Sequence, residues 1–459
     1  MYASLHSPLG RIEPALMPFS RKIHQTLACL SFFLMAGPTL RPAVASGAPS
    51  QIASQTSTKD KSSSPALDAT ASLQLFDAAV QTVEADLPKG SELSARWSGQ
   101  ATSTRATLEA LLSRPKATRN ENSTTQNTAV NGETLARDAV NSLLHIAPEI
   151  RGRLYGNDEQ PFWALSTVFS GKRDSARLRQ IGAWLERRGK RWFVRRVFAD
   201  SPAERAGLLR GDEIVSVGGL PLAPVISFAS LRPNATVNIK YRRLPWGTPQ
   251  TLTLQTVSES FVESAWRDTA KGARIRNVQN KRIAYLPLWS ATHPEIHAAL
   301  LAAARAAEHD ADAMVLDLRG GFGGGDLSYL DSVFAVPSDS DKGGIPQRAA
   351  AFDKPLVALI DAETSGGKEW LAWLIHREHR GQLVGAPTAG ARQSGHATEL
   401  EPHRALLYLA EIPTAGVTDA PVVPDQAESG SLMYAAGSDR QLDRALGLAA
   451  AAAVGAAAQ

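Results

Sequence analysis

The chain has 459 residues, which corresponds to about two to four domains and is long enough to bury a sizeable core. Its composition, 43% hydrophobic and 20% charged with 35 Gly and 27 Pro, excludes a collagen-like or wholly disordered polymer. The formal net charge is +4, but residues 1–45 hold four of the basic residues, and the remainder carries 45 basic and 44 acidic residues. This balance argues against a basic surface for nucleic acid, and no nucleic-acid partner is expected.

The first 45 residues have the pattern of an export signal. Arg21 and Lys22 precede an apolar run over 26–37, which is too short for a membrane span of about 20 residues. Small residues ending at Ala45 predict cleavage after that position. The mature chain is then periplasmic or secreted, has no stable membrane anchor, and lacks Cys29, the only cysteine. An uncleaved anchor or a buried helix is the alternative.

Residues 46–67 are rich in Ser, Thr, Ala and Gln, without periodic apolar positions, and are predicted to be a flexible linker. Apolar residues then recur at helical spacing over 73–83, 108–112 and 135–144. We therefore expect a helical N-terminal region over 68–165, interrupted by a polar loop at 114–132.

From residue 192 the apolar period changes to that of strands, which are predicted at 192–198, 213–217, 237–241 and 251–254. Between the first two, Ser201 and Pro202 have the types expected at a helix N-cap and first turn, and Gly207 follows the helix.

Three motifs within 195–219 carry a family resemblance, namely Ser201-Pro-Ala203, Ala206-Gly-Leu208 and Gly211-Asp-Glu-Ile214. They resemble a PDZ domain of the bacterial protease type, here over 176–258. The resemblance implies a groove that takes an extended peptide, usually a free C-terminus, as an added strand. Its carboxylate loop would lie near Ile181, Gly182 and Ala183. A packing module whose groove is filled from within is the alternative.

After residue 280 strands alternate with helices, which is typical of βαβ units on one sheet. Strands are predicted at 283–288, 313–318 and 356–360, and helices at 294–308 and 365–376. The chain ends in an Ala-rich helix over 431–459, where Ser438 and Gln441 have capping-box spacing. The expected fold class is therefore α/β within an α+β multidomain chain.

A second set of motifs occupies this βαβ region: Asp317-Leu-Arg-Gly-Gly-Phe-Gly-Gly324, then Leu359 to Ala372, Leu383 to Gly390, and Val423-Pro-Asp425. Together with the PDZ-like block they resemble the tail-specific (C-terminal-processing) serine peptidases over about 175–450. The resemblance implies a crotonase-like catalytic core at 262–430.

The resemblance also implies where the reacting groups stand. The glycine loop would supply oxyanion amides, and Gly323 and Gly324 match its pattern. Counting back from Glu369 places the nucleophile at Gly366, and the base falls on Ala391. A glycine cannot be acylated and an alanine cannot accept a proton, so both halves of the dyad are missing in this register.

Ser365 and Lys368 offer an alternative, because S-x-x-K spacing puts a hydroxyl and an amine on one face of a helix. Ser365 would be the nucleophile and Lys368 the base. In the competing interpretation, Ser365 or Thr364 only caps the helix. The leading hypothesis is an exported serine-type peptidase acting on polypeptides with a free C-terminus. The alternative is an inactive homologue that binds peptides as an adaptor or sensor, and the oligomeric state stays open.

No cofactor or metal is expected. His376 and His379 have H-x-x-H spacing without a further ligand cluster, so no zinc site is predicted there. His293 and His297 lack the Glu that the metalloprotease motif needs and are interpreted as ordinary surface residues. The segment 385–390 resembles the start of a phosphate loop, but the Lys and Ser/Thr that bind phosphate and Mg²⁺ do not follow it.

Overall fold

The computed structural model describes residues 69–113, 132–169, 176–337, 347–392, 395–402, 404–411 and 420–456. The expected export signal with Cys29, the linker at 46–67 and nearly all of the polar loop at 114–132 lie outside these ranges. Within them, no helix combines the length and apolar character needed to cross a membrane.

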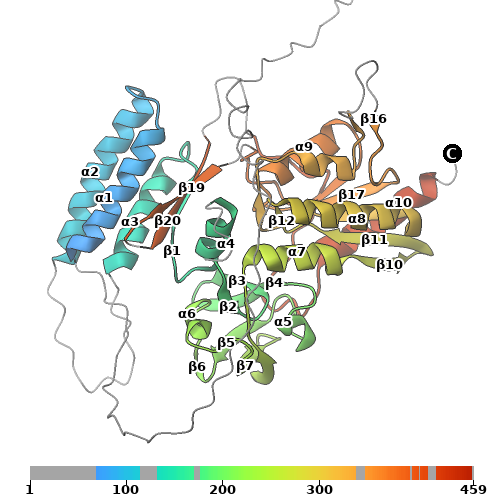
Figure 1. Ribbon diagram of the computed structural model, residues 1–459, viewed down its shortest axis with the longest axis horizontal. Coiled ribbons are helices and arrows are strands. Elements are labelled where there is room, and N and C mark those ends of the chain that lie inside the picture. Colours follow the sequence, from blue (N-terminus) through green and yellow to red (C-terminus); the bar gives the residue numbers. More distant parts are fainter. Residues whose placement is uncertain are drawn as a thin grey trace, which may run out of the picture. The chain divides into compact units, whose positions relative to one another are not determined.

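The N-terminal region combines three helices with a small sheet (Figure 1). The helices bury Leu75, Phe76 and Leu143, and these pack with Leu407 of a strand that comes much later in the chain. That strand, β20, lies between β1 and β19, both antiparallel to it. The elements are α1 (Ala69–Asp86), α2 (Glu92–Leu112), α3 (Gly132–Ile146), β1 (Gly152–Gly156), β19 (Gly395–Leu400) and β20 (Ala405–Ala410), followed in the chain after β1 by α4 (Gln160–Phe169).

The middle region is a six-stranded antiparallel sheet in which β3-β4-β5-β7-β8 follow one another and β6 pairs with β5, so that β3 lies at an edge. The predicted cap at Ser201 is confirmed, because its hydroxyl accepts a hydrogen bond from the Glu204 amide. The elements are β2 (Leu178–Gln180), β3 (Ala183–Arg188), β4 (Arg191–Val197), α5 (Pro202–Arg205), β5 (Glu213–Val217), β6 (Leu220–Pro221), α6 (Ile226–Ala229), β7 (Thr236–Arg242), β8 (Gln250–Gln255) and β9 (Val257–Glu259).

The C-terminal region contains a six-stranded sheet in the order β10-β11-β13-β17-β18-β21, parallel except for the β10–β11 pair. Alternate residues of its central strands face opposite sides: Val315 packs against α10, whereas Leu316 packs in the cluster that holds α7, α8 and α9. The elements are α7 (Phe261–Gly272), β10 (Arg274–Val278), β11 (Lys281–Pro287), α8 (Pro294–Asp310), β13 (Ala313–Asp317), β17 (Leu356–Ile360), α9 (Gly367–Arg377), β18 (Gln382–Gly385), β21 (Gln426–Ala427) and α10 (Arg440–Ala456).

Short elements complete this region, and one of them builds the glycine loop. β12 (Ser290–Ala291) and β14 (Phe322–Gly323) form a parallel pair. The remaining short elements are the 3₁₀ helix η2 (Ser328–Ser332) and the strands β15 (Val336–Pro337) and β16 (Gln347–Arg348).

The capping box predicted at the start of the last helix is wrong. The Asp439 carboxylate, rather than Ser438, accepts the Leu442 amide (3.2 Å). The Gln441 side chain donates instead to the Glu428 carbonyl (2.8 Å), because a tertiary partner is available to it.

Candidate functional site

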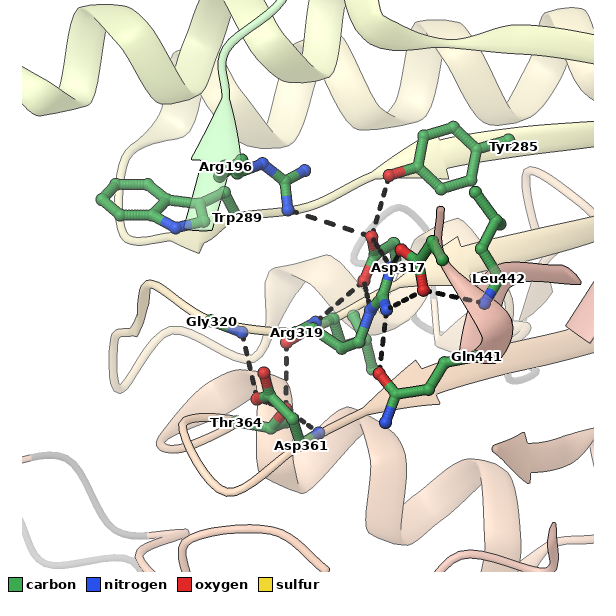
Figure 2. A network of polar contacts seen from close by, with 12 residues as sticks. Arg196, Tyr285, Trp289, Asp317, Arg319, Gly320, Asp361, Thr364, Gln441 and Leu442 are labelled. Atoms are coloured by element: carbon green, nitrogen blue, oxygen red, sulfur yellow. Dashed lines mark hydrogen bonds and ion pairs between the residues drawn. The ribbon is translucent and has the colours of Figure 1, made fainter. Parts of the chain in front are cut away.

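A buried ionic network supports the glycine loop (Figure 2). Asp317, at the end of β13, is 1% exposed and accepts the Tyr285 hydroxyl (2.8 Å) and the Arg319 Nε and Nη2 atoms (both 2.9 Å). Arg319 also donates to both carboxylate oxygens of Asp439 (2.9 and 2.8 Å) and to Gln441 (2.9 Å). Burial alone would raise the pKa of Asp317, but Arg319, together with Arg196 and the Tyr285 hydroxyl, outweighs it and lowers that pKa. The network therefore holds β13 against the start of α10.

The turn that follows β17 is tied to the same loop. Asp361 accepts the Gly320 amide (3.1 Å), and the Thr364 hydroxyl donates to the Leu318 carbonyl (3.0 Å). Asp361 also pairs with Arg195 of β4 at 2.7 Å. A PDZ-like strand is thereby linked to the loop and the turn through one carboxylate.

Lys368, the predicted base, is fully buried in the first turn of α9. Its Nζ donates to the carbonyls of Trp289 (3.0 Å), Leu318 (3.2 Å) and Gly320. Burial lowers the pKa of Lys368 to about 8. The three protons of the ammonium are matched by three carbonyls, so this side chain holds the glycine loop in place.

Ser365, the predicted nucleophile, is half-buried and precedes the helix. Among the described residues its hydroxyl has no hydrogen-bond partner, and it is not brought into hydrogen-bond contact with Lys368. The helix begins at Gly367 and its N-cap is Gly366, which has no side chain to cap with. The expectation that Ser365 or Thr364 caps this helix is therefore wrong, and so is the premise that Ser365 and Lys368 share one helical face.

The two predicted oxyanion glycines lie beside this turn, but one amide is already used. The Gly324 N–H donates to the Ala291 carbonyl (2.9 Å), and the Gly324 carbonyl accepts the Gly367 N–H (2.7 Å). The Gly324 amide therefore cannot serve as the expected oxyanion donor in this arrangement, because its N–H is already hydrogen-bonded next to the β12–β14 pair. Gly323 stays a candidate.

Gly323 and Gly366 approach each other backbone to backbone. Gly366 has φ 58° and ψ −138°, a conformation essentially confined to glycine. A Cβ at Gly366 would lie 2.7 Å from the Gly323 carbonyl carbon, and one at Gly323 would lie 2.9 Å from the Gly367 nitrogen. Neither position has room for a side chain without a shift of the backbone.

The position that the resemblance assigns to the base is next to Gly366. The Gly366 amide donates to the Ala391 carbonyl (2.7 Å). Glu369, buried in α9, accepts the Thr388 hydroxyl (2.5 Å) and the amides of Gly390 (2.9 Å) and Ala391 (2.7 Å). Burial raises the pKa of Glu369, and these donors oppose the shift. Sequence reasoning used Glu369 only to count register and missed that it positions the loop.

The predicted peptide-binding residues surround the start of β3. Ile181, Gly182 and Ala183 are buried, and Gly182 has φ 77°. The Ile181 and Gly182 carbonyls accept the amides of Ala203 (2.9 Å) and Phe198 (3.0 Å).

A cavity of about 640 Å³ lies between PDZ-like residues and the C-terminal region. Its walls include the ionic network described above and further arginines. Among the lining residues are Arg195, Arg196, Arg210, Tyr285, Trp289 and Arg319.

The histidines contact single carboxylates. His376 Nδ1 lies 3.2 Å from Asp425, and His297 Nε2 lies 2.7 Å from Asp331. The surface position expected for His293 is wrong, because this residue is 8% exposed and is the N-cap of α8. Within the described ranges, no group of three or more His, Cys, Asp or Glu residues could hold a metal.

Comparison with known families assigns both motif blocks. Residues 193–243 match the PDZ domain, and residues 282–412 match peptidase family S41. A carboxyl-terminal-processing protease of Synechocystis sp. is 30% identical over 213 residues, which is 42% of this chain and 47% of that protein. The chain thus spans about half the length of this curated relative.

Two solved structures are similar at lower identity. The photosystem II D1 C-terminal processing protease is 20% identical, with a TM-score of 0.42, covering 78% of this chain and 93% of that one. A putative S41 protease from Bacteroides fragilis is 16% identical, with a TM-score of 0.42, covering 67% and 87%. The sequence matches thus place a PDZ domain ahead of a peptidase family S41 domain in this chain, which is similar to a carboxyl-terminal-processing protease.

Proposed function

We propose that this chain is a peptide-binding member of the tail-specific peptidase family that does not cleave peptides through a serine–lysine dyad. The observation that carries the proposal is the contact between Gly366 and Gly323, in which backbone fills the space that a nucleophile's side chain would need. Ala391, opposite Gly366, offers a methyl group where a base is required. Acyl transfer needs a nucleophile within reach of a proton acceptor, and this pair supplies neither.

A second candidate is a serine-type peptidase with Ser365 as nucleophile and Lys368 as base. Two observations favour it: the Ser365 hydroxyl has no partner among the described residues, and burial lowers the pKa of Lys368 to about 8. Such an enzyme would have to free the Lys368 amine from its three carbonyls and use the Gly323 amide as an oxyanion donor.

The ligand in either case is a polypeptide with a free C-terminus recruited by the PDZ domain, which the match over 193–243 supports. We propose that the chain acts in the periplasm or outside the cell, after cleavage behind Ala45. Sequencing of the exported protein tests this location, which would be wrong if the mature chain began well away from Ser46.

Labelling with a fluorophosphonate separates the two functions. The wild-type chain, Ser365→Ala and the exposed control Ser230→Ala are compared, with binding of C-terminal peptides measured in parallel. The first proposal expects no adduct in any of them and equal peptide binding. An adduct on wild type and Ser230→Ala that is absent from Ser365→Ala would overturn it in favour of the peptidase.

A further inference from the structure

The edge strand of the PDZ domain is where an added peptide strand would pair. β3 is hydrogen-bonded to β4 on one side only, and no strand pairs with its other side among the described residues. Peptides that extend a sheet bind through main-chain N–H and C=O groups, which point outward on alternate residues of the edge. On β3 the outward groups nearest the predicted carboxylate loop belong to Ala183 and Leu185.

Both of these groups are already bonded, and to a single side chain. Gln160 Nε2 donates to the Ala183 carbonyl (3.1 Å), and Gln160 Oε1 accepts the Leu185 amide (2.9 Å). A primary amide presents one acceptor and a donor on the same planar unit, as a peptide group does. Gln160 therefore makes the pair of bonds that a bound strand would make to this part of β3.

This contact is buried and backed by packing. Gln160 is 5% exposed and starts α4. Trp184, between the two bonded residues, packs edge-on against Phe261 (5.0 Å between ring centroids) and Trp289 (5.1 Å). The far end of β3, by contrast, is exposed at Arg187. Gln160 thus covers the half of the edge next to the predicted carboxylate loop.

We infer that Gln160 occupies the ligand edge of the PDZ domain from within the chain, so that a polypeptide C-terminus must displace it to bind. The inference rests on the proposed peptide-binding function and describes how that binding is regulated. The groove stays closed until the start of α4 moves away from β3. The competing ligand is an extended peptide with a free carboxylate, because the covered positions lie where a terminal residue would sit.

The test uses the full chain with Gln160→Ala, and with Gln160→Glu, which keeps an acceptor for Leu185 but loses the donor to Ala183. Gln255→Ala, at an exposed position of β8, is the control. Hydrogen exchange at the Leu185 amide reports the contact without any ligand. We expect faster exchange in Gln160→Ala and no change in the control.

Binding is measured by fluorescence anisotropy with a pool of labelled octapeptides ending in a free carboxylate, and with the same pool amidated. Removing two competing hydrogen bonds should tighten binding of the free-carboxylate pool roughly tenfold. Unchanged Leu185 exchange, or equal binding by wild type and Gln160→Ala, would overturn the inference and leave peptide binding intact. Faster exchange with no binding by either protein would support the internal contact and refute the proposed function.

Discussion

Two parts of the candidate site differ in the chemical groups that they contain: the side chains that hold the glycine loop and the turn in place, called the support below, and the two positions expected to react. The support consists of charged groups with full sets of partners: Asp317 with Arg319, Lys368 with three carbonyls, and Glu369 with three donors. The reacting positions, Gly366 and Ala391, contribute only backbone to each other. The network that shapes this turn thus needs no nucleophile, and its intactness is not evidence of catalysis.

Substitution of Asp317 in the support should lower the free energy of unfolding more than substitutions at the reacting positions. Asp317→Asn removes the fully buried one of the two carboxylates that pair with Arg319, and we expect a loss of about 3–5 kcal/mol in the free energy of unfolding at pH 7. Because the pKa of Asp317 is lowered in the folded chain, its stabilisation is present above the ordinary carboxyl pKa and fades as the pH falls. The difference between wild type and variant should therefore shrink in acid.

Denaturant unfolding measures this effect. Asp310→Asn is the matched control, since its ion pair with Arg282 spans 3.9 Å at the surface and should contribute little. Equal effects of the two substitutions would mean that the network does not support the fold.

Restoring a serine at the nucleophile position should damage the site rather than repair it. Gly366→Ser forces a side chain into a glycine-only conformation and against Gly323, at a cost of about 3 kcal/mol. Combined with Ala391→Lys, it should still give no fluorophosphonate adduct. Gly447→Ser in α10, where a Cβ has open space, is the control for unfolding. Adduct formation by the double variant would contradict the closed-site interpretation.

Because of Lys368, the free energy of unfolding should increase as the pH rises above 8. Its pKa is about 8 in the folded chain, below the ordinary lysine value, so between these values the unfolded chain holds a proton that the folded chain has lost. The free energy of unfolding of wild type relative to Lys368→Met should therefore rise by about 3 kcal/mol from pH 7 to pH 11.

Unfolding across this pH range measures the effect, and Lys89→Met at an exposed site should show no such trend. If the difference in free energy of unfolding between wild type and Lys368→Met did not change with pH, burial would not destabilise the ammonium form of Lys368.

The features predictable from sequence were those set by nearby residues. The Ser201 cap and the apolar strand predicted at 313–318 follow from local spacing, and both are present, the strand as Ala313–Asp317. The conformation of Gly366 depends on Gly323, which is remote in the chain, and no spacing rule reports that contact.

Partners remote in sequence explain the other errors. Gln441 prefers Arg319 and the Glu428 carbonyl to a local capping box. The helical N-terminal region was predicted, but its small sheet was not, because the pairing of β1 with β20 joins segments too far apart for periodicity to connect. The Gln160 contact with β3 has no sequence signature, although a filled groove was one expected alternative.

Glu369 connects the two parts of the site, because it belongs to the support and accepts hydrogen bonds from the loop that carries Ala391. A substitution at Glu369 therefore tests whether the two parts can be disturbed separately. Glu369→Gln keeps the shape of the side chain but replaces a charged acceptor by a neutral amide with one oxygen, and we expect a loss of about 2 kcal/mol. Hydrogen exchange at Gly390 and Ala391 should accelerate, with little change at Gly320, which Asp361 holds instead. Thr388→Val, which removes one of the three donors, should have a smaller effect. Equal acceleration of hydrogen exchange at all three amides would mean that the loop and the turn open together. The support and the reacting positions would then be one cooperative unit, contrary to the distinction made here.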